Sequence, residues 1–132
     1  MNITMIQVAC GAMFTQDGYI LMGQRHPQDE NPFYWEFPGG KCLKNESLKN
    51  CLHREWKEEL NLEIHIEKEI YANVSNGYEC VFYIGTIIDI ENLEKKVHNK
   101  IKFCNIEDIH HLKLFEEDKE IPIILQSYFV NK

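Results

Sequence analysis

The spacing of apolar and polar residues divides the chain into strand-like and helix-like segments. Residues 5–14 and 79–88 are continuous apolar runs rich in β-branched and aromatic side chains, which predicts two buried strands in the middle of a sheet. Residues 19–24 follow an Asp-Gly turn signal, so they are predicted to form the return strand of a hairpin. Residues 63–74 alternate apolar and polar positions with one slip, which predicts a half-exposed, bulged strand.

Two segments have helical patterns. Residues 47–60 predict an amphipathic helix that Asn45 or Ser47 can cap, because a short side-chain oxygen accepts hydrogen bonds from the first free backbone N–H groups. Residues 121–130 are apolar-rich and predict a terminal helix. The segments between the last long strand and that helix are predicted to be a polar loop with one helical turn at 89–100, a short strand at 101–104 and a helical turn at 106–111.

The first of these helices carries acidic residues on the face that should be buried. At roughly 100° per residue, Glu55 and Glu59 fall within the apolar stripe that contains Leu48 and Cys51, and Glu58 flanks them. One interpretation is a solvated acidic face. The other is a site for a hard cation, because buried carboxylates are normally paired or bound to metal, and Mg²⁺ prefers oxygen ligands. The apolar neighbours favour the cation site.

The residues around this helix resemble the Nudix box. Gly40 is followed after five residues by Glu46 and after seven more by the run 54–62, REWKEELNL, so every charged position of the box is present. Trp56 stands where an aliphatic residue is usual, and Asn61 stands where a glycine usually ends the box. Asparagine is common among non-glycine residues at positive φ, so Asn61 is expected still to make the helix-ending turn.

This resemblance implies a fold and a reaction. The fold would be an α/β/α sandwich with a mixed sheet between the box helix and the C-terminal helix, and residues 1–132 would form a single Nudix hydrolase domain. Members of the family hydrolyse a nucleoside diphosphate linked to a further group, with Mg²⁺ as cofactor and Mn²⁺ as an alternative. The run 35–41, WEFPGGK, is similar to the MutT-like branch, which favours a nucleoside triphosphate such as a dNTP or 8-oxo-dGTP, cleaved to the monophosphate and pyrophosphate.

Other activities stay open beside this one. The same site would suit a dinucleoside polyphosphate, a nucleotide sugar or a capped RNA end. A catalytically silent nucleotide-binding module is a further alternative.

The resemblance also implies which residues bind the metal. The expected ligands are the carboxylates of Glu55, Glu58 and Glu59 and the backbone carbonyl of Gly39, which together would bind one to three Mg²⁺ ions. Such ions would clamp phosphate oxygens and acidify a water molecule. Glu55 is also expected to orient or deprotonate that water.

Glu46 and Arg54 are expected to support this cluster. Glu46 is about nine residues before Glu55, half a turn out of phase on a continuous helix, so we place it on the loop ahead of the helix. Arg54 is either a solvated partner of Glu58 or an orienting residue that binds a carboxylate through two hydrogen bonds. The predicted catalytic residues are therefore Glu46, Arg54, Glu55 and Glu58.

Substrate contacts are predicted at five positions: Arg25, Phe37, Gly40, Lys41 and Asp118. Arg25 ends a strand where MutT-like proteins have an arginine near the nucleotide, although a surface charge is the alternative. Phe37, like Trp35, either lines a base pocket or belongs to the core. Asp118 best matches the Asn or Asp that reads the base before the terminal helix. Glu120 is the second match, and a simple helix N-cap at Asp118 is the alternative.

The loop at 89–100 departs from the MutT-like pattern. A Glu-His pair is expected near its end, but only the histidine, His98, is present, and Val97 occupies the glutamate position. That glutamate is a further metal ligand or a candidate base in some members of the family. Its role is therefore left to the box glutamates, to Glu94 if the loop shifts, or to His98 as a substitute base.

Composition narrows the class of protein. The chain has 132 residues, of which 44% are hydrophobic and 27% charged, as expected for one soluble globular domain. Its formal net charge of −7 argues against a nucleic-acid surface and would repel a polyphosphate unless divalent metal reverses the local sign. The five cysteines form no CxxC pair, no apolar run approaches the roughly 18 residues of a membrane span, and no secretory signal is expected, which predicts a cytoplasmic protein.

Overall fold

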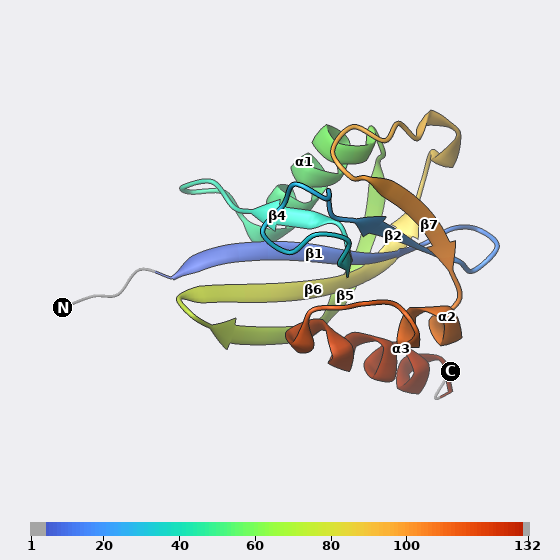
Figure 1. The fold of residues 1–132 in the computed structure, drawn as a ribbon. Helices are drawn as coiled ribbons and strands as arrows, with labels where there is room; N and C mark the ends of the chain where they lie inside the picture. Colours follow the sequence, from blue (N-terminus) through green and yellow to red (C-terminus); the bar gives the residue numbers. More distant parts are fainter. Residues whose placement is uncertain (1–4, 131–132) are drawn as a thin grey trace.

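The computed structural model describes residues 5–130, so the two ends of the predicted 1–132 domain, residues 1–4 and 131–132, lie outside the described residues. In this part of the chain the centre of the fold is a mixed seven-stranded sheet with the order β3-β2-β1-β6-β5, in which β4 also pairs with β1 and β7 with β2 (Figure 1). The strands are β1 (Ile6–Phe14), β2 (Ile20–Gln24), β3 (Trp35–Glu36), β4 (Gly39–Lys41), β5 (Ile64–Ser75), β6 (Tyr78–Ile87) and β7 (Lys100–Cys104). The helices are α1 (Leu48–Leu60), α2 (Ile106–His110) and α3 (Glu120–Val130), with short 3₁₀ turns η1 (Ile90–Asn92) and η2 (Glu116–Lys119).

The sheet lies between two helical layers, as the sequence predicted. Helix α1 covers one face, and α2 and α3 cover part of the other (Figure 1). Alternate residues of β1 point to the two layers: Ala9 and Met13 pack in the core beneath α1, whereas Ala12 and Phe14 pack in the core beneath α3. The α/β/α sandwich with a mixed central sheet is therefore confirmed.

Strands β1, β2, β5, β6 and β7 follow the predicted segments within one or two residues, whereas the short strands β3 and β4 were not predicted. Strand β1 is central, since it pairs parallel with β6 from Ile6 to Phe14 and antiparallel with β2 and β4. The slip in the alternating pattern of β5 corresponds to register shifts between Ile66 and Lys68 and between Glu69 and Tyr71, so the predicted bulge is confirmed. None of the described helices is long and apolar enough to cross a membrane.

The two unusual positions of the box are accommodated at α1. Trp56 is fully buried, and its indole Nε1 donates a hydrogen bond of 2.9 Å to the carbonyl of Pro38, which ties α1 to the segment between β3 and β4. Ser47 caps the start of the helix, because its Oγ accepts from the backbone N–H of Asn50. Asn61 ends the helix in the left-handed conformation with φ of 58°, as expected.

The conformation of Asn61 gives a test of stability. Asn61→Ala is expected to lower the free energy of unfolding by about 1–2 kcal/mol, because a Cβ without a polar group is disfavoured in the left-handed region. Asn61→Gly is the matched control and should cost less, although it loses the amide hydrogen bond to the carbonyl of Asn92. Urea unfolding compares the two variants. An alanine variant as stable as the glycine variant would contradict the argument.

Candidate functional site

An open pocket with a volume of about 710 Å³ lies on the α3 side of the sheet. Its floor is made by β1 and β6, and its walls come from the segment 25–41, the C-terminal end of α1, the loop before β7 and the segment before α3. The pocket brings together seven of the predicted site residues: Arg25, Phe37, Gly39, Gly40, Lys41, Glu59 and Asp118. All five predicted substrate residues are thus in its lining.

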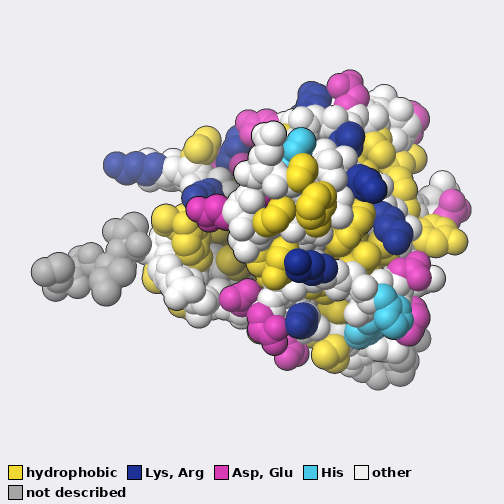
Figure 2. Space-filling view, viewed as in Figure 1, with side chains coloured by type: hydrophobic (Ala, Val, Ile, Leu, Met, Phe, Trp, Pro, Cys, Tyr) yellow, Lys and Arg dark blue, Asp and Glu magenta, His cyan; other side chains and the backbone are white. Residues whose placement is uncertain are grey.

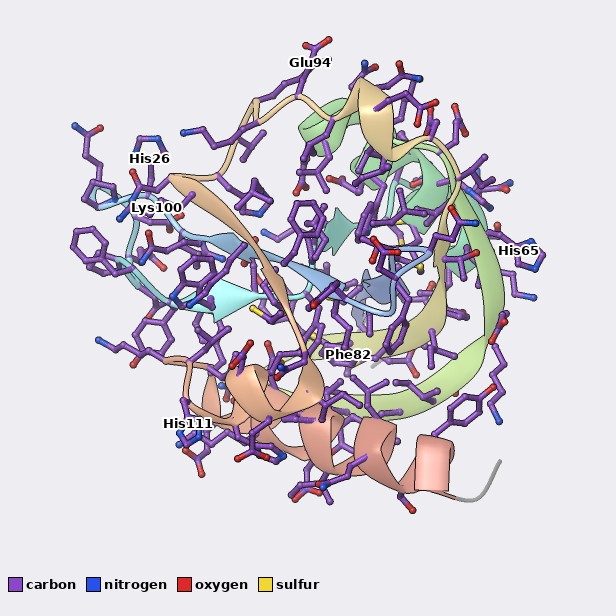
Figure 3. All side chains as sticks on the ribbon, turned by 90° about the vertical axis from the view of Figure 1, so that its right-hand side faces the viewer. His26, His65, Phe82, Glu94, Lys100 and His111 are labelled. Atoms are coloured by element: carbon purple, nitrogen blue, oxygen red, sulfur yellow. The ribbon has the colours of Figure 1, made fainter. Side chains whose placement is uncertain are left out.

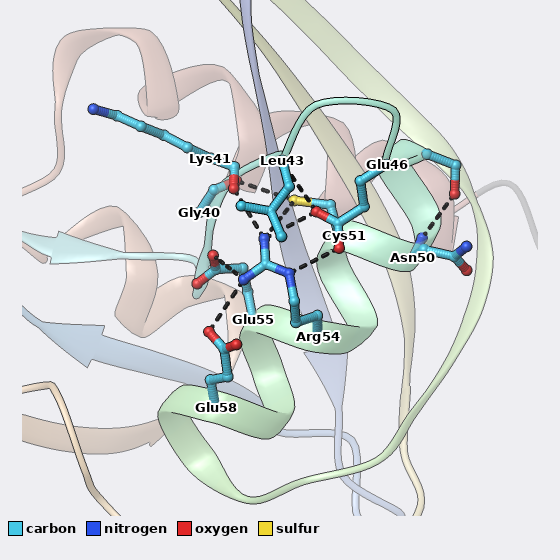
Figure 4. A network of polar contacts seen from close by, with 10 residues as sticks. Gly40, Lys41, Leu43, Glu46, Asn50, Cys51, Arg54, Glu55 and Glu58 are labelled. Carbon is cyan, nitrogen blue, oxygen red and sulfur yellow. Dashed lines mark hydrogen bonds and ion pairs between the residues drawn. The ribbon is translucent and has the colours of Figure 1, made fainter.

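Arg54 is the centre of a polar network beside the pocket (Figure 4). Its Nε and Nη2 donate to the two oxygens of Glu46 at 2.8 and 2.9 Å, so the pair is bidentate. Its Nη1 donates to Glu55 and Glu58 at 2.9 and 3.1 Å, and Nη2 also reaches the carbonyl of Lys41. Both predicted partners of Arg54 are therefore present, and a half-buried guanidinium connects three carboxylates.

Glu46 lies on the loop ahead of α1, as expected from its being half a turn out of phase with Glu55 on a continuous helix. The hydrogen bonds from Arg54, followed by that from the backbone N–H of Leu43, lower its pKa to about 2. The carboxylate is therefore charged at neutral pH and is a permanent anchor for Arg54.

Glu59 is in the opposite electrostatic situation. Its side chain is buried, with the residue only 9% exposed. Burial is the largest cause of a pKa raised to about 9, and a hydrogen bond with Glu55 and the negative charges of Glu55, Glu36 and Glu58 add to it. With this pKa, the Glu59 carboxyl keeps its proton near neutral pH when no cation is bound.

Gly40 allows the chain to approach this acidic pair. A Cβ at Gly40 would lie 2.5 Å from the carboxyl carbon of Glu55, so a larger residue would displace that side chain. Gly39, the residue before it in β4, lines the pocket and pairs with β1. The oxygen donors of Glu55, Glu59 and Gly39 suit a hard divalent cation, whereas Glu58 is 59% exposed and bound to Arg54.

The sequence analysis did not include Glu36 in the site. Its Oε2 lies 2.9 Å from Nε2 of His98, which is itself 3.7 Å from Oε1 of Glu59. These ligand-type atoms all lie within 4.8 Å of one another, and His98 is only 4% exposed. The available signal was an acidic residue between two aromatic residues in the run WEFPGGK. His98 was considered only as a base, and no pattern linked it to Glu36.

The structure places Val97 and Glu94, the two loop residues considered for the missing loop glutamate, differently relative to the pocket. Val97 lines the pocket and is 54% exposed, so this position does face the site. Glu94 instead accepts a hydrogen bond from the side-chain amide of Asn61 at the end of α1 and projects away from the sheet (Figure 3). In this conformation Glu94 does not line the pocket, and backbone hydrogen bonds to the carbonyls of Glu59 and Leu60 hold the loop.

Asp118 lies in η2 at the wall of the pocket and is half-buried. Burial, followed by the charges of Glu117 and Glu36, raises its pKa to about 7. Within residues 5–130 its carboxyl group makes no hydrogen bond, so the N-cap alternative has no support there. Glu120, the second match for this position, is exposed at the start of α3.

Charges of both signs border the site. On the face shown in Figure 2, basic and acidic side chains are interspersed around apolar ones. Arg25 is the basic residue at the α3 end of the pocket, where it forms ion pairs with Asp29 and Glu36 at 2.7 and 3.1 Å.

Comparison with known proteins identifies the family. The family model described as the NUDIX domain matches residues 5–123. The chain belongs to the Nudix family. The resemblance inferred from the box is thereby confirmed, and with it the enzyme class of a Nudix hydrolase.

Individual relatives agree with this assignment. The chain is 44% identical to a CTP pyrophosphohydrolase of Escherichia coli (strain K12) over 123 residues, which cover 91% of this chain and 89% of that protein. It is 30% identical to an 8-oxo-dGTP diphosphatase of Proteus vulgaris over 59 residues, covering 45% and 53% of the two chains. The solution structure of the E. coli ORF135 protein matches with a TM-score of 0.82 and 25% identity, covering 98% of this Nudix chain and 94% of that one.

Glu59 gives a prediction for metal binding. The folded-state pKa of about 9 lies above the ordinary 4.5, so the metal-free carboxyl is protonated near neutral pH, and a divalent cation should displace that proton. Calorimetric titration with Mn²⁺ near pH 7.5, in two buffers that differ in ionisation enthalpy, should show release of about one proton per protein.

The matched variant and the pH dependence check the same assignment. Glu59→Gln has no proton to release and should bind metal, more weakly, without it. The folded state of the metal-free protein binds more protons than the unfolded state between pH 4.5 and about 9, so its stability should fall as pH rises through that window. Metal binding by the wild type without proton release would contradict the assignment.

Proposed function

We propose that the protein hydrolyses a nucleoside triphosphate to the monophosphate and pyrophosphate, with Mg²⁺ as cofactor and a cytosine nucleotide as its preferred substrate. The observation that carries the proposal is the buried Glu59, hydrogen-bonded to Glu55, at the wall of a pocket of nucleotide size. The identity of 44% with a CTP pyrophosphohydrolase supports the nucleotide class.

The chemistry asks for positioning and charge neutralisation more than for covalent catalysis. Bound at Glu55, Glu58, Glu59 and the Gly39 carbonyl, Mg²⁺ would supply neutralisation of phosphate charge and a more acidic water. Arg54 keeps Glu55 and Glu58 in place, and Glu55 orients or deprotonates the attacking water. Lys41 and Arg25 contribute positive charge at the pocket wall, where a chain with a net charge of −7 would otherwise repel a polyphosphate.

The base would lie on the apolar floor beside Asp118. Phe37 is buried there and packs edge-on against Phe82, so it serves both the core and the pocket. A protonated Asp118 offers one donor and one acceptor, which matches N3 and the N4 amino group of cytosine. An ionised Asp118 only accepts hydrogen bonds and loses this match.

The five free cysteines and the lack of a membrane-crossing helix in the described part suit a cytoplasmic enzyme, which is the location we propose.

The function is tested by product analysis over a substrate panel. With Mg²⁺, the wild type is expected to release pyrophosphate from CTP or dCTP faster than from 8-oxo-dGTP, a dinucleoside polyphosphate, a nucleotide sugar or capped RNA. Glu58→Gln should lower kcat by roughly 10²–10⁴-fold, because the metal loses a charged ligand. Glu63→Gln, an exposed residue just beyond α1, is the control and should be unaffected.

Two outcomes would contradict different parts of this proposal. Binding without any product would support the silent nucleotide-binding module instead. Full activity of Glu58→Gln would remove Glu58 from the metal site while leaving the enzyme class intact.

The pKa of Asp118 predicts a pH-dependent base preference. The value of kcat/KM for CTP should fall in the wild type relative to Asp118→Asn as pH rises from 6 to 8, because the protonated carboxyl that pairs with N3 and N4 of cytosine is lost through a pKa of about 7. The amide of Asp118→Asn offers a donor and an acceptor and does not titrate, so it is the pH-independent reference. A ratio of the wild type to Asp118→Asn that stays constant with pH would exclude Asp118 from base recognition.

A further inference from the structure

We propose that His98 is a positioning residue: through Glu36 it fixes the guanidinium of Arg25 in the orientation that binds substrate. The inference rests on the proposed function, in which Arg25 contacts the nucleotide. It concerns two residues, Glu36 and His98, that the predicted site did not assign to substrate binding.

Glu36 connects the histidine to the arginine. Its Oε2 lies 2.9 Å from Nε2 of His98, and its Oε1 accepts a hydrogen bond of 3.1 Å from Nη1 of Arg25. The second terminal nitrogen of Arg25 donates to Asp29 at 2.7 Å, and the guanidinium carbon lies 5.6 Å from the ring centre of Phe115. These contacts with Glu36, Asp29 and Phe115 therefore set the orientation of the Arg25 guanidinium. The hydrogen bond between His98 and the other oxygen of Glu36 in turn holds the Glu36 carboxylate in place.

The environment of His98 indicates which nitrogen carries the proton. Nδ1 is buried and has no hydrogen-bond partner among the described residues. A proton on Nε2 gives Glu36 its donor and leaves Nδ1 as a bare acceptor, whereas a proton on Nδ1 would leave a buried N–H unsatisfied. Nε2–H of His98 is thus assigned as the donor to Glu36.

The same observation argues against His98 as a metal ligand. A histidine that binds metal almost always donates its other ring N–H to a carboxylate, carbonyl or water. The group formed by Glu36, Glu59 and His98 has the spacing of a cation site, but Nδ1 of His98 lacks that support in the described structure. A hydrogen-bonded support for Arg25 accounts for the geometry with fewer unsatisfied groups.

The fold reserves space for this ring. Gly23 of β2 pairs with Glu36 of β3, and a Cβ at Gly23 would lie 2.4 Å from Cδ2 of His98. The imidazole therefore fills the space over Gly23 and reaches the neighbouring strand. Asn99 fixes the loop to β2 through two hydrogen bonds to Gln24, at 2.8 Å from its backbone N–H and 2.9 Å from its side-chain amide.

The test compares two variants of His98 whose side-chain amides place the N–H donor at different distances from the backbone. The amide nitrogen of His98→Gln reaches the position of Nε2, whereas that of His98→Asn reaches only the position of Nδ1. His98→Asn should raise KM for the nucleotide by about tenfold or more, with kcat less affected, because a hydrogen bond to a charged group is lost. His98→Gln should restore KM to within about threefold of the wild type. His65→Asn, on the exposed face of β5, is the matched control.

A double-mutant cycle separates positioning from a purely structural role. In an Arg25→Ala background, His98→Asn should change KM by less than about twofold, since the group that it positions is absent. A full additive effect in that background, or a glutamine variant as impaired as the asparagine variant, would overturn the proposal. So would loss of Mn²⁺ binding in His98→Gln by electron paramagnetic resonance, which would make His98 a ligand.

The outcome for His98 is distinguishable from the outcome for the proposed function. If the wild type hydrolyses no nucleotide, the function fails, and the same variants are compared by calorimetry with α,β-methylene-CTP. Equal dissociation constants for the wild type and His98→Asn would then overturn the positioning role as well.

Discussion

Excess negative charge at the C-terminal half of α1 is the constraint on which the site depends. Burial of Glu59, followed by its hydrogen bond with Glu55 and the negative charges of Glu55 and Glu36, raises the pKa of Glu59 to about 9. The two arginines beside this cluster are already engaged, Arg54 with the box carboxylates and Arg25 with Asp29 and Glu36. Neutralisation must therefore come from protons or from a divalent cation, and the latter is what a polyphosphate substrate also needs.

Two arginine–glutamate pairs lie beside this centre. Arg54 and Glu46 form a bidentate pair that lowers the pKa of Glu46 to about 2, whereas the pKa of Glu59 is raised to about 9. Arg25 and Glu36 form the second pair at the pocket wall. Environments that separate carboxyl pKa values this widely let some groups stay charged as anchors while another exchanges its proton for a ligand.

Much of this arrangement follows from local sequence. The period of 3.6 residues put Glu55 and Glu59 on the inner face of α1, and the phase of Glu46 excluded it from the helix. The left-handed turn at Asn61 was expected because this residue stands where the box usually ends in glycine, and asparagine tolerates that conformation. The roles of Arg25 and Asp118 came only through the resemblance to the family, because neither lies in a periodic pattern that indicates a site.

The contact between Glu36 and His98 was beyond prediction for a physical reason. The two residues are 62 positions apart and meet only after β2 has paired with β3 on one side and β7 on the other. No propensity or spacing in the chain specifies that meeting. The missing side chain of Gly23 makes it sterically possible, and the sequence shows only a glycine in a strand.

The valine at position 97 is consistent with the same charge balance. A glutamate there would face the pocket and add a fourth carboxylate to a group whose members already repel one another. With valine at position 97, no further carboxylate is added, and the next residue, His98, contributes a hydrogen-bond donor to Glu36. The site therefore needs less compensating positive charge than a Nudix site with a glutamate at position 97. Hydrogen bonds such as those from His98 and Arg25 to Glu36 orient its side chains instead.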